Sequence, residues 1–216
     1  MFIGKYDKSV IVTYLGIVST MIGIYLVLGN STPNVTGSII CLMISGICDM
    51  FDGKVARMCK NRTEEDKQYG IQIDSLTDMV SFIAYPIIIL YGIVNTFDVG
   101  LCPYIAIPVL SLFTICGISR LAFFNVNATL EDGPVKYYTG LPVTSTAIVF
   151  PVIYLLRYVF SNKVFVSIYL TVFALLSVLM IFKFKIKKPK TNSWYVACSI
   201  LAFIMAIVLI LLKVMY

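Results

Sequence analysis

Long apolar runs dominate the chain, and short polar segments separate them. The runs lie at roughly 9–29, 35–58, 70–95, 103–125, 139–159, 163–182 and 193–213. Each has about the 20 residues that an α-helix needs to cross ~30 Å of hydrocarbon. Because the runs are continuous and do not alternate, helices are favoured over a barrel. The pattern predicts one all-α transmembrane domain over residues 1–216, with seven spanning helices.

The composition agrees with a membrane protein. Hydrophobic residues make up 59% of the chain and charged residues 13%, and the mean hydropathy is +0.92. Soluble domains do not reach such values. The first apolar run is too long for the core of a signal peptide and has no small-residue cleavage site after it, so we expect it to be retained.

The distribution of basic residues predicts the orientation. With a cytoplasmic N-terminus, fourteen of the 17 Lys and Arg residues lie in inside segments, and only Arg157, Lys163 and Lys213 lie on the other side. The positive-inside rule therefore predicts an N-terminus in the cytoplasm. The basic run KFKIKKPK (183–190) either fixes topology or also binds anionic lipid head groups. The chain has no aromatic-interleaved basic surface, which excludes nucleic acid as a partner.

Cysteine and histidine usage excludes one kind of metal site. The chain has 6 cysteines, none in a CxxC pair, and no histidine. A zinc site of the usual Cys/His kind is therefore not expected. We interpret the cysteines as small apolar packing residues.

Four aspartates interrupt the apolar pattern at the predicted cytoplasmic ends of the second and third spans. The stretch DMFDGKVAR places five residues within roughly 140° of a helix: Asp49, Asp52, Gly53, Ala56 and Arg57. The next helix places three within roughly 80°: Gly70, Asp74 and Asp78. Two helices joined by a short loop run antiparallel as neighbours, so we expect the four carboxylates to meet in one cavity.

Such a cluster of carboxylates repels itself unless cations neutralise it. Oxygen ligands without His or Cys suit magnesium, manganese or calcium. We therefore expect a divalent metal site that holds two ions. The neighbouring acids Glu64, Glu65 and Asp66 are expected to be solvated loop residues without such a role.

Small residues and an arginine extend this site. Gly53 and Ala56 leave space on the acidic face, and Arg57 is placed to pair with a phosphate. Metal ions beside such a face suggest a diphosphate substrate and phosphoryl or phosphatidyl transfer. The alternative is a divalent-cation transporter that uses the same aspartates. Against it, the acids cluster at one membrane face, and no inverted repeat with broken helices is visible.

The pattern DxxDGxxAR followed by GxxxDxxxD resembles the signature of the CDP-alcohol phosphotransferases. The loop between Arg57 and Gly70 is longer than is common in that family, but the spacing within each half is intact. The resemblance implies a core of six transmembrane helices, hence at least one extra helix here, a homodimer, and a polar cavity open to the cytoplasm.

The same resemblance implies roles for the signature residues. Four aspartates would bind two Mg²⁺ or Mn²⁺ ions: Asp49, Asp52, Asp74 and Asp78. Asp78 would also be the catalytic base. The CDP-lipid would contact a second, overlapping set: Asp52, Gly53, Ala56, Arg57 and Gly70. The substrate would be a CDP-linked lipid that an alcohol attacks at its β-phosphate.

Three further stretches resemble the serine-specific branch of this family, the CDP-diacylglycerol–serine O-phosphatidyltransferases: SLTDMVSFIAYP (75–86), SRLAFFNV (119–126) and YYTGLPVTSTA (137–147). This resemblance implies CDP-diacylglycerol and L-serine as substrates and phosphatidylserine and CMP as products. Phe123 and Thr144 stand where those enzymes commonly have an arginine and a proline. A glycerol-phosphate, inositol-phosphate or choline acceptor therefore stays open as an alternative.

Basic and polar residues at the cytoplasmic mouth are the candidates for binding the acceptor. Arg120 could bind the serine carboxylate or a lipid phosphate, or it could simply snorkel to the interface. Asn125 and Lys136 border the same mouth and are the other two acceptor-binding candidates.

Overall fold

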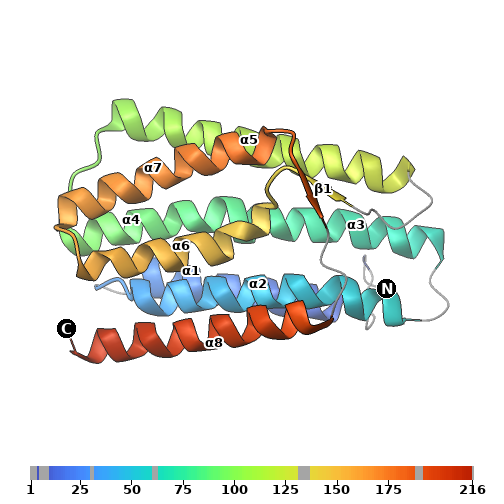
Figure 1. The fold of residues 1–216 in the computed structure, drawn as a ribbon, viewed down its shortest axis with the longest axis horizontal. Helices are drawn as coiled ribbons and strands as arrows, with labels where there is room; N and C mark the ends of the chain where they lie inside the picture. The colour runs from blue at the N-terminus through green and yellow to red at the C-terminus, as the bar shows by residue number, and fades with distance from the viewer. Residues whose placement is uncertain are drawn as a thin grey trace.

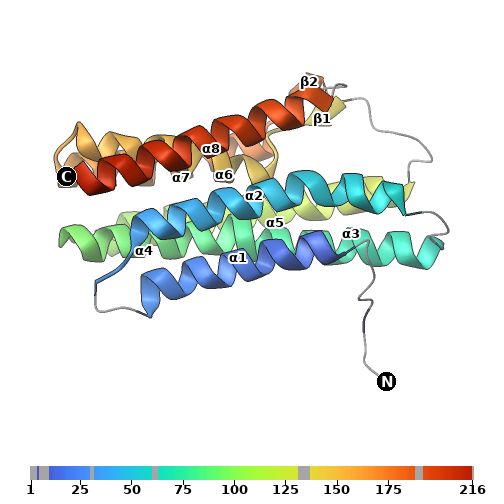
Figure 2. The same cartoon turned by 90° about the horizontal axis from the view of Figure 1, so that it is seen from below.

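The computed structural model describes residues 4, 10–29, 32–59, 63–130, 137–187 and 192–215, of which 128–130, 137–139, 185–187 and 192–198 are described by their backbone. In this part of the chain, long helices lie side by side in a bundle (Figure 1). The longest are α1 (Ile11–Leu28), α2 (Val35–Met58), α5 (Pro103–Leu130), α7 (Asn162–Ile181) and α8 (Asn192–Met215). Figure 2 shows the same bundle from below, with α1 beside α3.

One further long helix contains a change of helical type. It consists of α3 (Glu64–Asp78), the π-helical segment η1 (Met79–Ala84) and α4 (Tyr85–Phe97), which run on without a break. Single π-helical turns inside α-helices are rare and often occur at functional sites. Here the π segment begins directly after Asp78.

The predicted all-α membrane fold is confirmed. Five helical stretches are long and apolar enough to cross a membrane: 11–28, 35–58, 64–97, 103–127 and 162–181. The other two predicted spans correspond to shorter apolar helical stretches, Val143–Tyr158 and Ser199–Met215. The bundle therefore has a helical segment for each of the seven predicted spans, within the residues described.

The segment predicted as a span over 139–159 begins later than expected. It consists of a 3₁₀ turn η2 (Val143–Ser145), α6 (Thr146–Tyr154) and a second 3₁₀ turn η3 (Leu155–Tyr158). Gly140 has a φ of 73°, and Pro142 is extended, so the helix cannot start before Val143.

Two short strands add a feature that the apolar pattern does not predict. β1 (Tyr137–Thr139) pairs antiparallel with β2 (Lys185–Lys187), with Tyr138 opposite Ile186. Beside the pair, the Gly140 N–H donates to the Phe184 carbonyl (2.9 Å), and the Leu141 N–H donates to the Leu179 carbonyl (3.1 Å). These bonds join the start of α6 to the end of α7.

Small residues bring α1 close to α2. A Cβ added at Gly16 would lie 3.3 Å from the Cys48 Cβ, and one added at Gly23 would lie 2.8 Å from the Cys41 Cβ. Membrane helices pack through such close backbone approach and through hydrogen bonds between helices. The Ser19 hydroxyl provides one such bond, because it donates to the Cys41 carbonyl at 3.0 Å.

Aromatic side chains fill the space between α5, α6 and α7. Phe113, Phe150 and Phe173 are fully buried, and the Phe173 ring centroid lies 4.9 Å from that of Phe113 and 4.6 Å from that of Phe150. The Tyr169 ring stacks on Phe150 at 5.0 Å. This aromatic core fixes three helices, whereas α1, α2 and α3 carry the polar residues described next.

Candidate metal and substrate site

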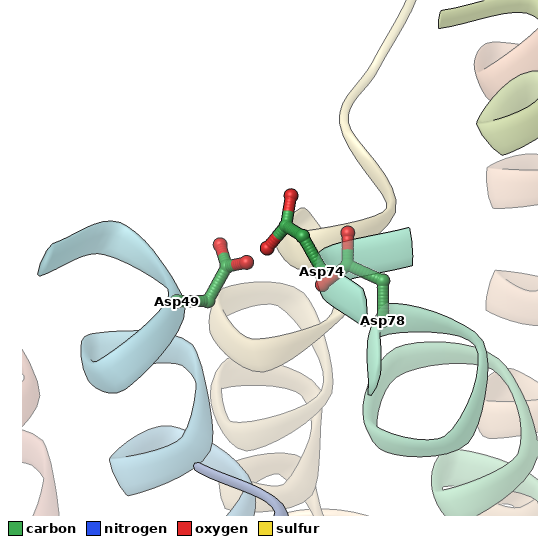
Figure 3. Close-up of side chains that lie close together, drawn as sticks. All are labelled: Asp49, Asp74 and Asp78. Carbon is green, nitrogen blue, oxygen red and sulfur yellow. The ribbon is translucent and has the colours of Figure 1, made fainter. Parts of the chain in front are cut away.

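Three aspartates point toward one another where α2 faces α3 (Figure 3). Asp49 comes from α2, and Asp74 and Asp78 lie one turn apart on α3. One carboxylate oxygen of each lies within 4.8 Å of the others. Asp78 is only 8% exposed. We call these three residues the aspartate cluster.

Local sequence explains why α3 presents its two aspartates together. The helix begins at a capping box, in which the Asp66 N–H donates to the Thr63 Oγ1 and the Thr63 N–H donates to the Asp66 carboxylate. From this fixed start, the four-residue spacing puts Asp74 and Asp78 on one face. The expectation that Asp66 belongs to a solvated loop is therefore corrected, since it caps α3 and Glu64 and Glu65 form its first turn.

The fourth predicted carboxylate, Asp52, lies beside the aspartate cluster and has a partner from another helix. The Thr13 hydroxyl of α1 donates to the Asp52 Oδ2 at 2.9 Å. Asp52 is also within hydrogen-bonding reach of Asp74 and near enough to Arg57 for electrostatic attraction. The four carboxylates thus line one small cavity, together with Thr13 and Gly16 of α1.

A layer of hydroxyl groups lies next to the carboxylates, on the side away from the α2–α3 connection. The Thr20 hydroxyl lies 2.8 Å from the Ser81 hydroxyl and donates to the Ser45 Oγ at 3.1 Å. All three side chains are buried, and Ser81 belongs to the π segment that follows Asp78. The three hydroxyls thereby connect α1, α2 and η1 beneath the carboxylates.

The predicted CDP-binding residues lie on the same two helices, in the parts that lead to the α2–α3 connection. A Cβ added at Gly53 would meet only the Arg57 Nη1 within 4 Å, at 3.5 Å, so this face of α2 is open. Arg57 is exposed, and Ala56 and Gly70 are partly exposed. An open helix face beside an exposed guanidinium suits a phosphate-bearing ligand.

Two of the three acceptor-binding candidates lie on α5, which packs against α3 and η1. The Arg120 side chain is 9% exposed, and its guanidinium lies 4.4 Å from the centroid of the Phe124 ring. Asn125 accepts a hydrogen bond from the Ser75 hydroxyl at 2.6 Å. Ser75 directly follows Asp74 in the sequence. The third candidate, Lys136, lies outside the described residues.

The aspartate cluster fits a hard divalent cation. Three carboxylate oxygens, with no nitrogen or sulfur ligand, form a donor set that magnesium and manganese prefer. The hydroxyl groups of Thr20, Ser45 and Ser81 then hold together the helices that carry these carboxylates.

The comparison with protein families decides which kind of protein uses this site. The family model described as CDP-alcohol phosphatidyltransferase matches residues 9–175, which includes α1 to α6 and most of α7. The chain belongs to the CDP-alcohol phosphatidyltransferase family. The match includes every residue of the site described above.

Several curated relatives are similar to this member of the family. A CDP-diacylglycerol–serine O-phosphatidyltransferase of Saccharomyces cerevisiae is 38% identical over 124 residues, 53% of this chain and 41% of the relative. One of Helicobacter pylori is 32% identical over 165 residues, 76% of this chain and 65% of the relative. The archaetidylserine synthase of Methanothermobacter thermautotrophicus is 35% identical over 116 residues, 54% of this chain and 45% of the relative. The matched part thus spans less than two thirds of each of these relatives.

Proposed function

We propose that this protein transfers a phosphatidyl group from CDP-diacylglycerol to the hydroxyl of L-serine, with phosphatidylserine and CMP as products. The observation that carries the proposal is the aspartate cluster, positioned on two facing helices of a CDP-alcohol phosphatidyltransferase. The choice of serine as the acceptor is supported by the names of the relatives. Serine is part of the name both in the phosphatidyltransferases and in the archaetidylserine synthase.

In this proposal the aspartates hold two divalent ions, Mg²⁺ or Mn²⁺. Asp49, Asp74 and Asp78 contribute the oxygens that lie within 4.8 Å of one another, and Asp52 contributes from beside them. Such ions, when bound, bind phosphate oxygens and stabilise the charge of the departing nucleotide.

Asp78 acts as the general base. Its carboxylate accepts the proton of the serine hydroxyl while the serine oxygen forms a bond to the β-phosphorus. The bond between this phosphorus and the oxygen that bridges to the α-phosphate breaks, and CMP leaves with the bonding electrons.

The remaining candidates bind the two substrates. Gly53 and Ala56 admit the nucleotide to the open face of α2, where Gly70 borders it from α3, and Arg57 pairs with a phosphate. Arg120 pairs with the serine carboxylate, and Asn125, held by Ser75, lies on the same helix. We also propose Lys136 as an acceptor-binding residue, on the basis of its sequence position.

We further propose that the site faces the cytoplasm and that the enzyme is a homodimer in the cell membrane. The basic residues support this orientation. In this proposal the aspartates lie near the boundary between water and bilayer. The nucleotide and serine then reach them from water, while the acyl chains of the lipid stay in the bilayer.

CMP release by the purified full-length protein tests the proposal. CDP-diacylglycerol is supplied with Mg²⁺ or Mn²⁺ and with L-serine, inositol phosphate, glycerol 3-phosphate or choline in parallel. We expect CMP release that depends on serine and stops when EDTA removes the metal. Release with another acceptor alone would overturn the choice of serine, and no release with any acceptor would contradict the proposed phosphatidyl transfer.

Asp78→Asn tests the general base. We expect this variant to fold, because the amide has the same shape, and to lose about 10³-fold or more in turnover. The control is Glu65→Gln, which removes an exposed carboxylate from the first turn of the same helix and should keep full turnover. Near-normal turnover of Asp78→Asn would contradict the assignment.

A further inference from the structure

The aspartate signature lies on α2 and α3, but a third helix reaches the same carboxylates. The Thr13 Oγ1 of α1 donates to the Asp52 Oδ2 at 2.9 Å, and both side chains are buried, with 5% and 8% of their surface exposed. Thr13 also lines the cavity that the four carboxylates share. The Thr13 hydroxyl therefore contacts one of the four carboxylates directly.

The Thr13 bond differs in its acceptor from those of other threonines in the spanning helices: Thr20 and Thr36 bond to hydroxyl groups of other helices, and three more bond within their own helix. Thr96, Thr114 and Thr171 each donate to the carbonyl four residues earlier in their own helix, at 2.7, 2.8 and 2.8 Å. Such local bonds satisfy a hydroxyl without involving any other element. Thr13 instead donates to a carboxylate 39 residues away. Hydrogen bonds to a charged acceptor are the stronger kind.

We propose that Thr13 is a positioning residue that fixes the Asp52 carboxylate beside the aspartate cluster. With Oδ2 held by Thr13, the carboxylate cannot rotate freely, and it stays within reach of Asp74 and of Arg57. Gly16, one turn further along α1, allows this approach, because a Cβ there would lie 3.3 Å from the Cys48 Cβ. α1 thus becomes the third helix of the cation site.

The inference rests on the proposed function only for the presence of a cation site. It is tested with the full-length protein in detergent, by the Mn²⁺ concentration that gives half of the metal-dependent shift in thermal unfolding. Thr13→Val removes the hydroxyl and keeps the shape, whereas Thr13→Ser keeps the hydroxyl. Ser19→Ala is the matched control, because Ser19 is another buried donor from α1 to α2 whose acceptor is the Cys41 carbonyl.

We expect Thr13→Val to raise the half-saturating Mn²⁺ concentration about tenfold and Thr13→Ser to change it by less than about twofold. Ser19→Ala should lower the unfolding temperature and leave the Mn²⁺ dependence unchanged. In an Asp52→Asn background, Thr13→Val should have no further effect on Mn²⁺ binding, because the two residues act as a unit. If Thr13→Val does not fold, Thr13→Ala is judged by the same measurement.

An unchanged Mn²⁺ dependence in Thr13→Val, an equal shift in Ser19→Ala, or a wild-type protein that Mn²⁺ does not stabilise would overturn the inference. The measurement needs no acceptor alcohol. A protein with Thr13-dependent Mn²⁺ binding that used an acceptor other than serine would therefore support the role of Thr13 and overturn the choice of serine.

Discussion

Two glycines of α2 lie seven residues apart on one helical face and have different surroundings. A Cβ added at Gly46 would lie 2.5 Å from the Ala147 Cβ, so this glycine lets α2 pack closely against α6. A Cβ added at Gly53 would meet only the end of the Arg57 side chain. Gly46 therefore serves packing, and Gly53 leaves a face open beside the carboxylates.

This contrast gives a prediction for paired substitutions. Gly53→Val should fold, but its side chain should block the nucleotide and lower CMP release by roughly a hundredfold. Gly46→Val should overpack the α2–α6 contact and cost ~1–3 kcal/mol of unfolding free energy. Thermal unfolding and CMP release, measured on both variants, check the two effects. A Gly53→Val variant that unfolded at a lower temperature than Gly46→Val would contradict the assignment of the two glycines.

At the same scale, sequence spacing predicted which carboxylates meet but not how Asp52 is held. The positions of Asp49, Asp74 and Asp78 follow from helical periodicity and from a short connection, both of which are local properties. The Thr13–Asp52 bond depends on how α1 crosses α2, which no local pattern specifies. A weak signal was present, because small and hydroxyl residues recur every three or four positions along α1: Thr13, Gly16, Thr20 and Gly23.

At the scale of elements, the turn around Gly140 joins α6 to the end of α7. A Cβ at Gly140 would lie 2.9 Å from the Met180 carbonyl oxygen and 3.2 Å from that of Phe182, and the residue has a φ of 73°. Both the conformation and the close approach therefore require glycine.

Gly140→Ala should consequently lower the unfolding free energy by ~1–3 kcal/mol. The control is Gly100→Ala, since a Cβ at Gly100 meets nothing within 4 Å. Thermal unfolding of both variants checks this prediction. Equal unfolding temperatures would show that the turn adjusts to a side chain without cost.

The start of the helical segment that contains α6 also shows what the hydrophobic pattern could not predict. Residues 139–142 are apolar enough to join the predicted span 139–159, yet backbone pairing with the α7–α8 connection holds 137–139 as a strand. That pairing brings together segments nearly fifty residues apart in the sequence, so its cause is tertiary. The other spans agree with the pattern because burial in lipid and helical hydrogen bonding act within each run.

At the scale of the whole molecule, the proposed orientation gives a prediction that uses a native cysteine. Cys102 is exposed in the connection between α4 and α5, and Gln68 is exposed on α3, the helix that carries Asp74 and Asp78. In a variant with Cys102 as its one cysteine, an impermeant maleimide should label intact cells. With Gln68→Cys as the one cysteine, labelling should require permeabilised cells. The reverse pattern would place the aspartates outside the cytoplasm.

The π segment Met79–Ala84 sets the phase between the two halves of one long helix. Asp74 and Asp78 must face Asp49, while Tyr85, directly after the segment, donates a hydrogen bond to the Ser38 carbonyl at 2.6 Å. Deletion of one residue there, such as Val80, would turn one half against the other by about 100° and shift it by about 1.5 Å. The chain could then keep either its core contacts or its carboxylate geometry. Within these six residues, length is therefore constrained more tightly than composition.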